Sequence, residues 1–433
     1  MTISSKQKFL ILIISASLIE LLLICFDIFN GKRSIPLYIF IYFELFLLFS
    51  ISFLAIKAKQ PPEDKQFSSN ISIPLFIIVS GIIFRLTLFP AVPTTSPDVY
   101  RYIWEGKIVS HGINPYQVPP DAVQLNQYHS DVWEKVGFKN MTSIYPPAAQ
   151  LIFLMGYNLT GESVLGLKII YLLCEFITLL FLFKLLKLKG KNPEYLILYA
   201  WLPIPIMEYF INTHIDVAGI TFFILFLYYI EKRRYNLSSV FYSLSFLVKL
   251  YPLMLFPLLI KKLGIRKLLP FTLIFLIILI SFYAPFLTSD LSIKNTLATY
   301  IARWEFNGAV FNLSKIILGR ESARILCGIL LITSIAVISY KYKDFVNGAF
   351  GVLLSFVIFA TTLYPWYLGW IASLNPLMNF YSLFSLFLTS NFSNFTPMGL
   401  VWKEYGWVLL IEYIPFFILL YLDFRKNISI KKV

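Results

Sequence analysis

The sequence predicts an all-α protein that crosses a membrane many times. Of the 433 residues, 58% are hydrophobic, and the mean hydropathy is +0.74. Apolar stretches recur near or above the roughly 20 residues that a helix needs to cross a bilayer. Lys and Arg gather in short clusters between these stretches. Together these observations predict one polytopic membrane domain over residues 1–433, with about eleven to thirteen membrane helices and a large outer loop that carries short helices.

The expected membrane helices follow from the apolar stretches in chain order. They cover residues 9–29, 35–56, 72–93, 164–186, 195–211, 217–230, 237–260, 268–287, 323–340, 345–363, 366–388 (about two segments) and 407–422. The first stretch has no small-residue cleavage site before Gly31, so we expect it to remain as a span. Residues 145–157 are short for a span and predict a partial or horizontal helix on the outer face.

One expected span carries features that break a helix. Residues 237–260 hold Lys249 and Pro252 near their middle. Proline removes a backbone donor and a charge is costly in hydrocarbon, so we expect this segment to enter the membrane, break and return. A broken backbone is tolerated there only where it lines protein or water.

The distribution of basic residues predicts the topology. Clusters at residues 57–59, 184–191, 232–234, 261–267, 341–343 and 425–432 are assigned to the cytoplasm, because Lys and Arg favour that side. The loops between them then lie on the opposite side: residues 94–146, 212–216, 288–308 and 364–370. These loops are rich in Trp, Tyr, Asn, Asp, His and Pro, so we expect a composite site there, with residues 94–146 as the extracytoplasmic catalytic loop.

The composition also excludes some classes of function. A net charge of +14 would suggest nucleic acid as a partner of a soluble protein, but here the basic clusters are topology signals beside anionic lipid. Cys25, Cys174 and Cys327 lie in apolar runs without CxxC spacing, which argues against a zinc site or a disulfide framework. We therefore expect no nucleic-acid partner.

The first candidate site lies in residues 96–106, SPDVYRYIWEG, where Ser and Pro predict a helix start. On this helix Asp98, Tyr102 and Glu105 share a face, and Arg101 can pair with either acid. The acid either complements the helix dipole or acts as a general base on an acceptor hydroxyl. Both interpretations of Asp98 stay open at this point.

Two further segments of the outer loop have turn chemistry. Asn114 and Tyr116 flank a proline after His111-Gly112, and Tyr145 precedes Pro146-Pro147. These patterns disfavour helix continuation or start a new helix at the interface. The structural interpretation therefore leads for both segments.

A histidine, an acid and a lysine form the next candidates. His214 lies two residues from Asp216 at the end of an apolar run, which suits either a capped helix end or a donor or phosphate contact. Two such residues without a third make a poor metal signature. Lys249 either snorkels to the interface or meets an anion, for which phosphate is the obvious candidate.

Aromatic pairs beside amides complete the candidates. Trp304 and Asn307 lie in RWEFNG, and Trp366 and Tyr367 lie in YPWY. Flat aromatic faces suit sugar rings, and they also suit the lipid headgroup zone. Their value for a sugar site depends on their lying on the same side as Asp98 and His214.

The order of these motifs is similar to that of a known superfamily. SPDVYRYIWEGKIVSHGINPY, SIYPPAAQLIF, NTHIDVAGI, FLVKLYPLMLFP, RWEFNGAVFNL and TTLYPWYLGWI occur in this order between about residues 96 and 370. Together they resemble the C-superfamily of integral-membrane glycosyltransferases (GT-C), especially bacterial mannosyltransferase-like members that take sugar from a polyprenyl-phosphate carrier. The matching positions are Asp98, Tyr102, Gly106, Asn114, Pro115, Tyr116, Tyr145, Pro146, Pro147, His214, Asp216, Lys249, Pro252, Asn307, Pro365, Trp366 and Tyr367.

The resemblance implies a function. It implies inverting transfer of a hexose, with mannose favoured, from a polyprenyl phosphate to a hydroxyl of a lipid-linked or envelope glycan, in a bacterial cytoplasmic membrane with the active site on the extracytoplasmic face. Asp98 is then the general base; Arg101, His214, Asp216 and Lys249 are donor or phosphate candidates. Sugar or acceptor contacts fall to Tyr102, Glu105, Asn114, Tyr116, Tyr145, Trp304, Asn307, Trp366 and Tyr367.

Some features depart from the family pattern. Two apolar segments precede the span before the first large loop, where the usual plan has one. Asp98 is followed by Val99, where many relatives have a second acid, so metal use stays open and no other cofactor is expected. The alternative function, a lipid-linked sugar flippase or transporter, predicts paired half-repeats and charges in several spans, and the sequence shows neither. The oligomeric state cannot be read from the sequence.

Overall fold

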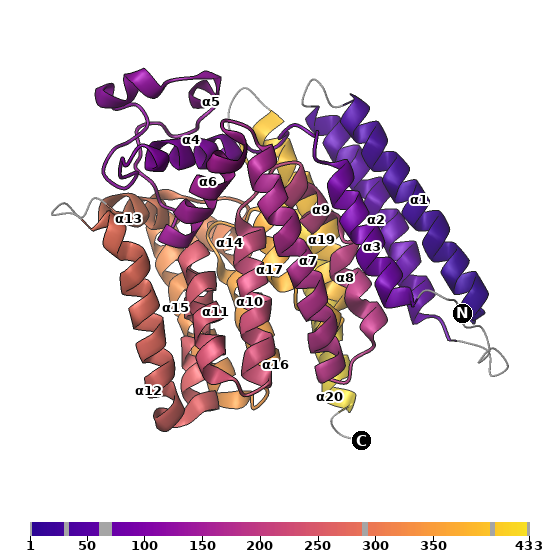
Figure 1. Ribbon diagram of the computed structural model, residues 1–433. Coiled ribbons are helices and arrows are strands. Elements are labelled where there is room, and N and C mark those ends of the chain that lie inside the picture. Colours follow the sequence, from indigo (N-terminus) through magenta and orange to yellow (C-terminus); the bar gives the residue numbers. More distant parts are fainter. Residues whose placement is uncertain (1, 30–33, 60–71, 288–292, 399–402, 431–433) are drawn as a thin grey trace. The chain divides into compact units, whose positions relative to one another are not determined.

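The computed structural model describes residues 2–29, 34–59, 72–287, 293–398 and 403–430. This part of the chain is built of helices joined by short loops (Figure 1), and within it only isolated bridges and no strand occur. The predicted all-α polytopic fold is confirmed. Residues 288–292 of the expected outer loop and 431–432 of the last basic cluster lie outside the described residues.

The chain divides into two compact units. The first comprises Met1–Thr95, Glu175–Ile211 and Ala372–Val433, and the second comprises Ser96–Cys174 and Asn212–Ile371. All candidate site residues named above fall in the second unit.

The first unit is a helical bundle formed by both ends of the chain and a central segment. Its elements are α1 (Ser5–Phe29), α2 (Ile35–Lys57), α3 (Ile73–Thr87), the later part of α7 (Leu165–Leu188), η3 (Pro193–Leu196), α8 (Ile197–Ala200), α9 (Pro203–Phe210), α18 (Asn375–Met378), α19 (Tyr381–Thr389), η7 (Ser390–Met398) and α20 (Gly406–Ile430). Prolines at the first turns of α2, α3 and α9 fit the N-terminal position, where a helix lacks a partner for the backbone N–H.

The second unit carries the candidate site. Its elements are α4 (Asp98–Ser110), η2 (Val123–Tyr128), α5 (Asp131–Glu134), α6 (Pro147–Thr160), the start of α7, α10 (Asp216–Glu231), α11 (Tyr235–Val248), η4 (Tyr251–Leu255), α12 (Phe256–Tyr283), η5 (Ala284–Phe286), α13 (Ile293–Arg303), α14 (Ala309–Leu318), α15 (Arg320–Lys341), α16 (Phe345–Phe359), η6 (Pro365–Tyr367) and α17 (Leu368–Ala372). The short segment expected at residues 145–157 forms the 14-residue helix α6.

Six helices in the described residues are long and apolar enough to cross a membrane. They lie at Ser5–Phe29, Ile35–Lys57, Leu165–Leu188, Tyr251–Phe286, Arg320–Lys341 and Gly406–Lys426. Shorter apolar helices occur at Ile73–Thr87, Ala309–Leu318 and Phe345–Phe359. Other expected spans are divided into shorter helices; residues 366–388, for instance, form η6, α17, α18 and α19.

The expected break in residues 237–260 is confirmed. α11 ends at Val248, and Lys249 has an extended backbone with φ −156° and ψ 138°. A 3₁₀ segment with Pro252 in its first turn leads into α12, which is itself interrupted at Gly264, where φ is 62°. Glycine accepts this left-handed conformation without a steric penalty, so the chain can turn there. The break leaves Lys249 outside regular helix.

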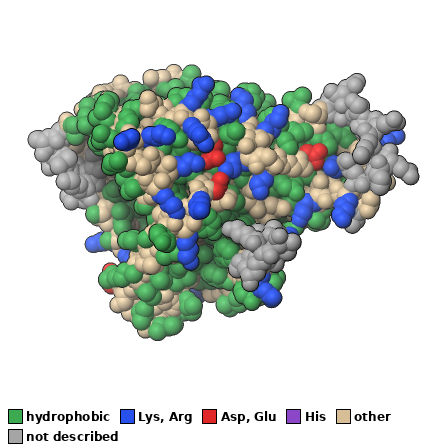
Figure 2. Space-filling view, turned by 90° about the horizontal axis from the view of Figure 1, so that it is seen from below, with side chains coloured by type: hydrophobic (Ala, Val, Ile, Leu, Met, Phe, Trp, Pro, Cys, Tyr) green, Lys and Arg blue, Asp and Glu red, His purple; other side chains and the backbone are tan. Residues whose placement is uncertain are grey.

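The basic clusters of the second unit lie at one end of it. Lys262 Nζ lies 3.5 Å from Glu231 Oε1 at the end of α10, and Lys261 donates to the carbonyl of Tyr340 near the end of α15. α10 has 16 residues, so at 1.5 Å per residue Asp216 lies roughly 24 Å from that end. The face seen from below is rich in Lys and Arg and poor in Asp and Glu (Figure 2).

Candidate active site

Helix α4 holds the candidate base at its N-terminus. The Asp98 backbone N–H donates to Ser96 Oγ at 3.3 Å, so Ser96 marks the helix start as expected, although the helix begins at Asp98 and not at Pro97. Gly106 lets α4 lie directly on α6, because a Cβ there would come within 2.3 Å of the carbonyl oxygen of Phe153. α4 is thereby fixed against α6 in the upper part of the second unit (Figure 1).

Asp98 is partly open and lies beside a histidine. Its side chain is 34% exposed, and its Oδ2 lies 3.8 Å from Nδ1 of the fully buried His214. Burial raises the pKa of the Asp98 carboxyl to about 6, against the opposing effect of Lys249 and together with the effect of Asp216. Asp98 and His214, expected on one side of the membrane, therefore lie in one centre, and Asp98 is a stronger base than an ordinary aspartate.

A strained turn presents His214. Thr213 has φ 60°, a left-handed conformation that is an outlier for a β-branched residue. Such strain persists only where the surroundings hold it and often marks a functional site. Burial, followed by the positive charge of Lys249, holds the pKa of His214 well below its usual value, so the imidazole is neutral. His214 can therefore offer a hydrogen bond to a phosphate but not a positive charge.

Lys249 is bound to Asp216 at the broken helix. Its Nζ lies 2.7 Å and 2.6 Å from the two Asp216 carboxylate oxygens, and the Trp370 indole N–H donates to Asp216 Oδ1 at 2.9 Å. Asp216 is completely buried, whereas the Lys249 side chain is 18% exposed. The anion that Lys249 meets in this structure is thus a carboxylate of its own chain, and the lysine side chain remains partly exposed.

Four stacked rings form a wall next to this centre. His214 stacks on Trp366 with centroids 3.8 Å apart, Trp366 on Tyr364 at 4.4 Å, and Tyr364 on Phe306 at 4.4 Å. Backbone hydrogen bonds from Phe306 N to Thr361 O and from Leu363 N to Phe306 O hold the two segments together. The buried Asn307 next to them has φ 51°. The two aromatic motifs therefore converge beside His214.

A second chain of rings leads away from Lys249. The ammonium group lies 4.2 Å from the Tyr367 ring centroid, a cation–π distance. The Tyr367 and Tyr300 hydroxyls are 2.8 Å apart, and the Tyr300 and Trp304 rings are 5.1 Å apart. Burial raises the pKa of Tyr300 to about 12, so its hydroxyl is neutral. Trp304 is thus connected to the centre through Tyr300.

The Arg101 and Glu105 pair holds the outer loop. Arg101 donates to Glu105 Oε1 at 2.5 Å, to the Phe138 carbonyl at 3.2 Å and to the Met141 carbonyl at 2.7 Å. The other Glu105 oxygen accepts from Ser143 Oγ and Gln150 Nε2. Both side chains are buried. These contacts fit the structural interpretation of the pair and leave the guanidinium little capacity for a phosphate.

The remaining loop candidates also make structural contacts. The Asn114 amide donates to the Phe286 carbonyl at 2.9 Å, and Asn114 Oδ1 accepts from the Tyr116 N–H at 3.0 Å. The Tyr116 hydroxyl donates to the Tyr145 carbonyl at 2.6 Å. The Tyr102 ring stacks on Phe153 at 4.5 Å and meets Tyr145 edge-on. Asn114 and Tyr116 shape the loop. The Tyr102 and Tyr145 rings contact each other near Asp98.

Sequence reasoning missed two participants. Trp370 holds Asp216, and Tyr300 holds Tyr367, yet neither was among the candidates. Trp370 lies four residues after Trp366, one helical turn away, and this spacing was the available signal. In the described residues, no three His, Cys, Asp or Glu side chains gather as a metal-binding group.

The helical membrane fold and this polar, aromatic centre agree with the class that the motif order resembles, the GT-C integral-membrane glycosyltransferases. A family model described as "Alpha-(1->6)-mannopyranosyltransferase, N-terminal domain" matches residues 39–263, slightly more than half of the chain, and the chain belongs to this family. The match contains Asp98, His214, Asp216 and Lys249. Membership supports a mannosyl transfer activity. A search among curated proteins finds no match for the chain.

Proposed function

We propose that this protein transfers a mannosyl group from a polyprenyl phosphate to a hydroxyl of a lipid-linked or envelope glycan, with Asp98 as the general base. The observation that carries the proposal is the position of Asp98, a partly exposed carboxylate with a raised pKa, 3.8 Å from His214 and in the electrostatic reach of Lys249. The family supports the mannosyl group, and the linkage in the family's name suggests an α-(1→6) bond.

The reaction is one displacement at the anomeric carbon. The acceptor oxygen attacks this carbon, its proton passes to the Asp98 carboxylate, and the bond from the carbon to the phosphate oxygen breaks. The bonding electrons leave with the polyprenyl phosphate. A single step with one acid and no evident nucleophile inverts the anomeric configuration.

The departing phosphate needs positive charge and hydrogen-bond donors. Lys249 supplies the charge: Asp216 holds its ammonium group, and the Lys249 side chain is 18% exposed. The neutral His214 ring supplies an N–H. Asp216 is an anion and cannot attract phosphate, so its part is to position Lys249, with Trp370 fixing the carboxylate. Electrostatic preorganisation of this kind is usually the largest single contribution to catalysis.

The sugar and the carrier lipid have separate surroundings. Trp366, Tyr364 and Phe306 cover one another's faces, so this ring wall would meet the C–H surface of a hexose with its ring edges. The isoprenoid tail would lie against lipid-facing helices such as α12, where Leu269, Leu273 and Ile277 are exposed. The basic clusters at the opposite end of the second unit support a cytoplasmic position for that end and an extracytoplasmic position for the site.

Replacing Asp98 by Asn tests the proposal. We expect a loss of transfer of about 10²- to 10⁴-fold, the range for a removed general base, in a protein that stays monodisperse in detergent. The assay follows labelled mannose from purified polyprenyl-phosphate mannose to a mannoside acceptor without a sealed compartment, which a transporter would need.

The matched control is Asp121→Asn, which removes an exposed acid of the same outer loop. This variant should transfer at the wild-type rate. Normal turnover of Asp98→Asn would remove Asp98 from its role, and the absence of transfer by the wild type with this donor would reject the donor class.

A further inference from the structure

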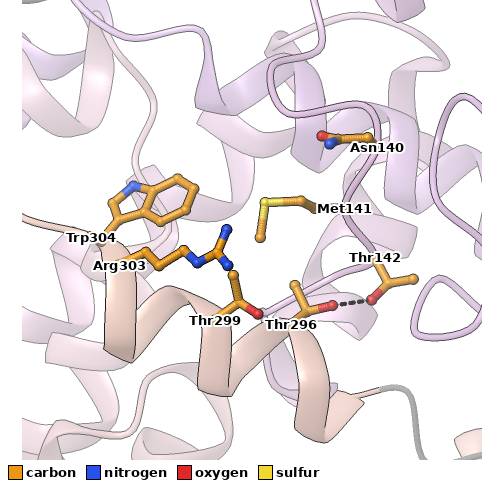
Figure 3. A pocket seen from close by; sticks show the side chains of 7 residues that line it. All are labelled: Asn140, Met141, Thr142, Thr296, Thr299, Arg303 and Trp304. Atoms are coloured by element: carbon orange, nitrogen blue, oxygen red, sulfur yellow. Dashed lines mark hydrogen bonds between the residues drawn. The ribbon is translucent and has the colours of Figure 1, made fainter.

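A cavity with a mixed polar and apolar lining lies beside Trp304, outside the centre described above. Its volume is about 380 Å³, near the lower end of the range for small-molecule sites. Residues 140–142 of the outer loop form one wall, and Thr296, Thr299, Arg303 and Trp304 form the other (Figure 3). The two walls are tied by a hydrogen bond of 2.5 Å between the Thr142 and Thr296 hydroxyls.

Helix periodicity directs the second wall into the cavity. Thr296, Thr299 and Arg303 lie at i, i+3 and i+7 of α13 and share one helix face. Figure 3 shows the Arg303 side chain reaching from α13 toward Met141, beside the Trp304 ring. The first wall is kept in place by Arg101, which donates to the Phe138 and Met141 carbonyls. Hydrogen bonds therefore fix the loop wall of the cavity and join it to α13.

The charge in this cavity is not compensated. No Asp or Glu lines it, and within the described part of the chain the Arg303 guanidinium makes neither a hydrogen bond nor an ion pair. The acid nearest in sequence, Glu305, is already engaged by three cations: Lys315 and Arg320 at 3.0 Å and Arg324 at 4.0 Å. An arginine fork with hydroxyl and amide neighbours and no acid is suited to an oxyanion.

The cavity is coupled to the transfer centre. Trp304 lines it and packs against Tyr300, whose hydroxyl lies 2.8 Å from that of Tyr367 beneath Lys249. Arg320, at the start of α15, donates to the Arg303 carbonyl at 2.6 Å. Since α15 has 22 residues, its basic end lies roughly 33 Å away. The cavity thus belongs to the same end of the unit as Asp98.

We propose that this cavity is a binding site for a polyhydroxylated ligand that carries an oxyanion, with Arg303 holding the phosphate or carboxylate and Trp304 and Thr299 contacting the polyol. The source of the group is either a charged acceptor glycan or the headgroup of an anionic lipid. The role as an acceptor site rests on the proposed function, whereas the binding itself does not.

Calorimetry on the purified full chain tests the binding without any transfer assay. The probes are mannose, mannose 6-phosphate, glucuronate and inorganic phosphate. We expect wild type to bind mannose 6-phosphate at least tenfold more tightly than mannose, and Arg303→Gln to lose at least tenfold of that affinity. Trp304→Leu should lose the preference for mannose 6-phosphate over inorganic phosphate.

Arg266→Gln is the matched control, because Arg266 is an exposed arginine of α12. This variant should bind like wild type. Phosphate that binds beside Lys249 is unaffected by Arg303→Gln, so only the component that this variant loses belongs to the cavity. Unchanged affinities for both anionic sugars in Arg303→Gln would overturn the proposal, whatever the outcome of the transfer assay.

Lipid nanodiscs distinguish the two sources. If phosphatidylglycerol weakens the Arg303-dependent binding of mannose 6-phosphate by tenfold relative to phosphatidylcholine, the site takes a lipid headgroup. If it does not, and a charged mannoside acceptor is transferred with a lower KM than its neutral counterpart only when Arg303 is present, the anion belongs to the acceptor.

Discussion

Two of the ion pairs in the described residues join a cation to a buried carboxylate but have different surroundings. In the first unit Arg85 of α3 pairs with Glu175 of α7 at 2.7 Å, and both side chains have 0% exposure. In the second unit Lys249 pairs with Asp216 at 2.6 Å, but the lysine is 18% exposed. The comparison shows that an ion pair in an apolar bundle is not by itself a sign of function.

The Arg85 pair makes all its observed polar contacts with the protein. Arg85 donates to Glu175 and to the carbonyls of Gly81 and Ala200, and the Tyr199 hydroxyl donates to the other Glu175 oxygen at 2.8 Å. No surface of either group is left for a ligand. The effect of the Arg85 pair must be on folding, because each charge compensates the other where neither side chain is exposed to solvent.

The Lys249 pair is arranged differently. Asp216 is held by Trp370 and is completely buried, so the carboxylate is fixed, while the Lys249 side chain is 18% exposed. Asp98, 34% exposed, lies within electrostatic reach of Lys249, and the strained turn at Thr213 precedes His214 beside Asp98. Accessibility and backbone strain, and not charge alone, separate the two regions.

The largest expected effect is the loss of stability when the buried Arg85–Glu175 pair is broken. Arg85→Met leaves Glu175 buried without its cation, which should lower the free energy of unfolding by about 3–5 kcal/mol. The midpoint of heat-induced loss of the monodisperse peak in detergent measures this. The double variant Arg85→Met with Glu175→Leu should recover most of the stability and transfer normally. If the Arg85→Met variant stayed folded but lost mannosyl transfer, the Arg85 pair would not be limited to folding, and the contrast between the two pairs would be wrong.

Breaking the Lys249–Asp216 pair should lower the rate of transfer. Lys249→Met removes the charge proposed for the leaving phosphate, so we expect kcat to fall by about 10²- to 10³-fold, the loss seen for one electrostatic donor. Transfer is measured on the monodisperse fraction. Lys262→Met, which removes a paired lysine from the opposite end of the same unit, is the control and should keep the wild-type rate. Full activity of Lys249→Met would show that the Lys249–Asp216 pair, like the Arg85 pair, contributes to folding and not to transfer.

The smallest expected effect is the dependence of transfer on pH. Because the pKa of Asp98 is raised to about 6, the carboxylate is ionised above pH 6, and kcat/KM should fall about tenfold per pH unit below it. The folded protein then binds this proton more tightly than the unfolded chain, so the contribution of Asp98 to stability decreases as pH rises toward 6. Asp98→Asn should lose this pH dependence and stay folded. A flat activity profile between pH 5 and 7 in wild type would exclude Asp98 as the base.

Much of the fold could be predicted because bilayer physics acts on local sequence. The apolar stretches, the break at Lys249 and the helix start at Ser96 were all readable from residue type and spacing. The site was predicted less completely. The sequence left Arg101 able to pair with either acid of its helix, and only the fold shows that it is bound to Glu105 and to the loop carbonyls.

The sequence by itself determined that the chain is a helical membrane protein with its polar and aromatic motifs in a recognisable order, since hydropathy and periodicity depend only on neighbours along the chain. The tertiary structure alone decided which charges are satisfied and which stay open. Asp98 and His214 are 116 positions apart in the chain and 3.8 Å apart in space, and Trp370 meets Asp216 across 154 positions. Such distances depend on how helices pack, and packing couples residues that no local pattern relates.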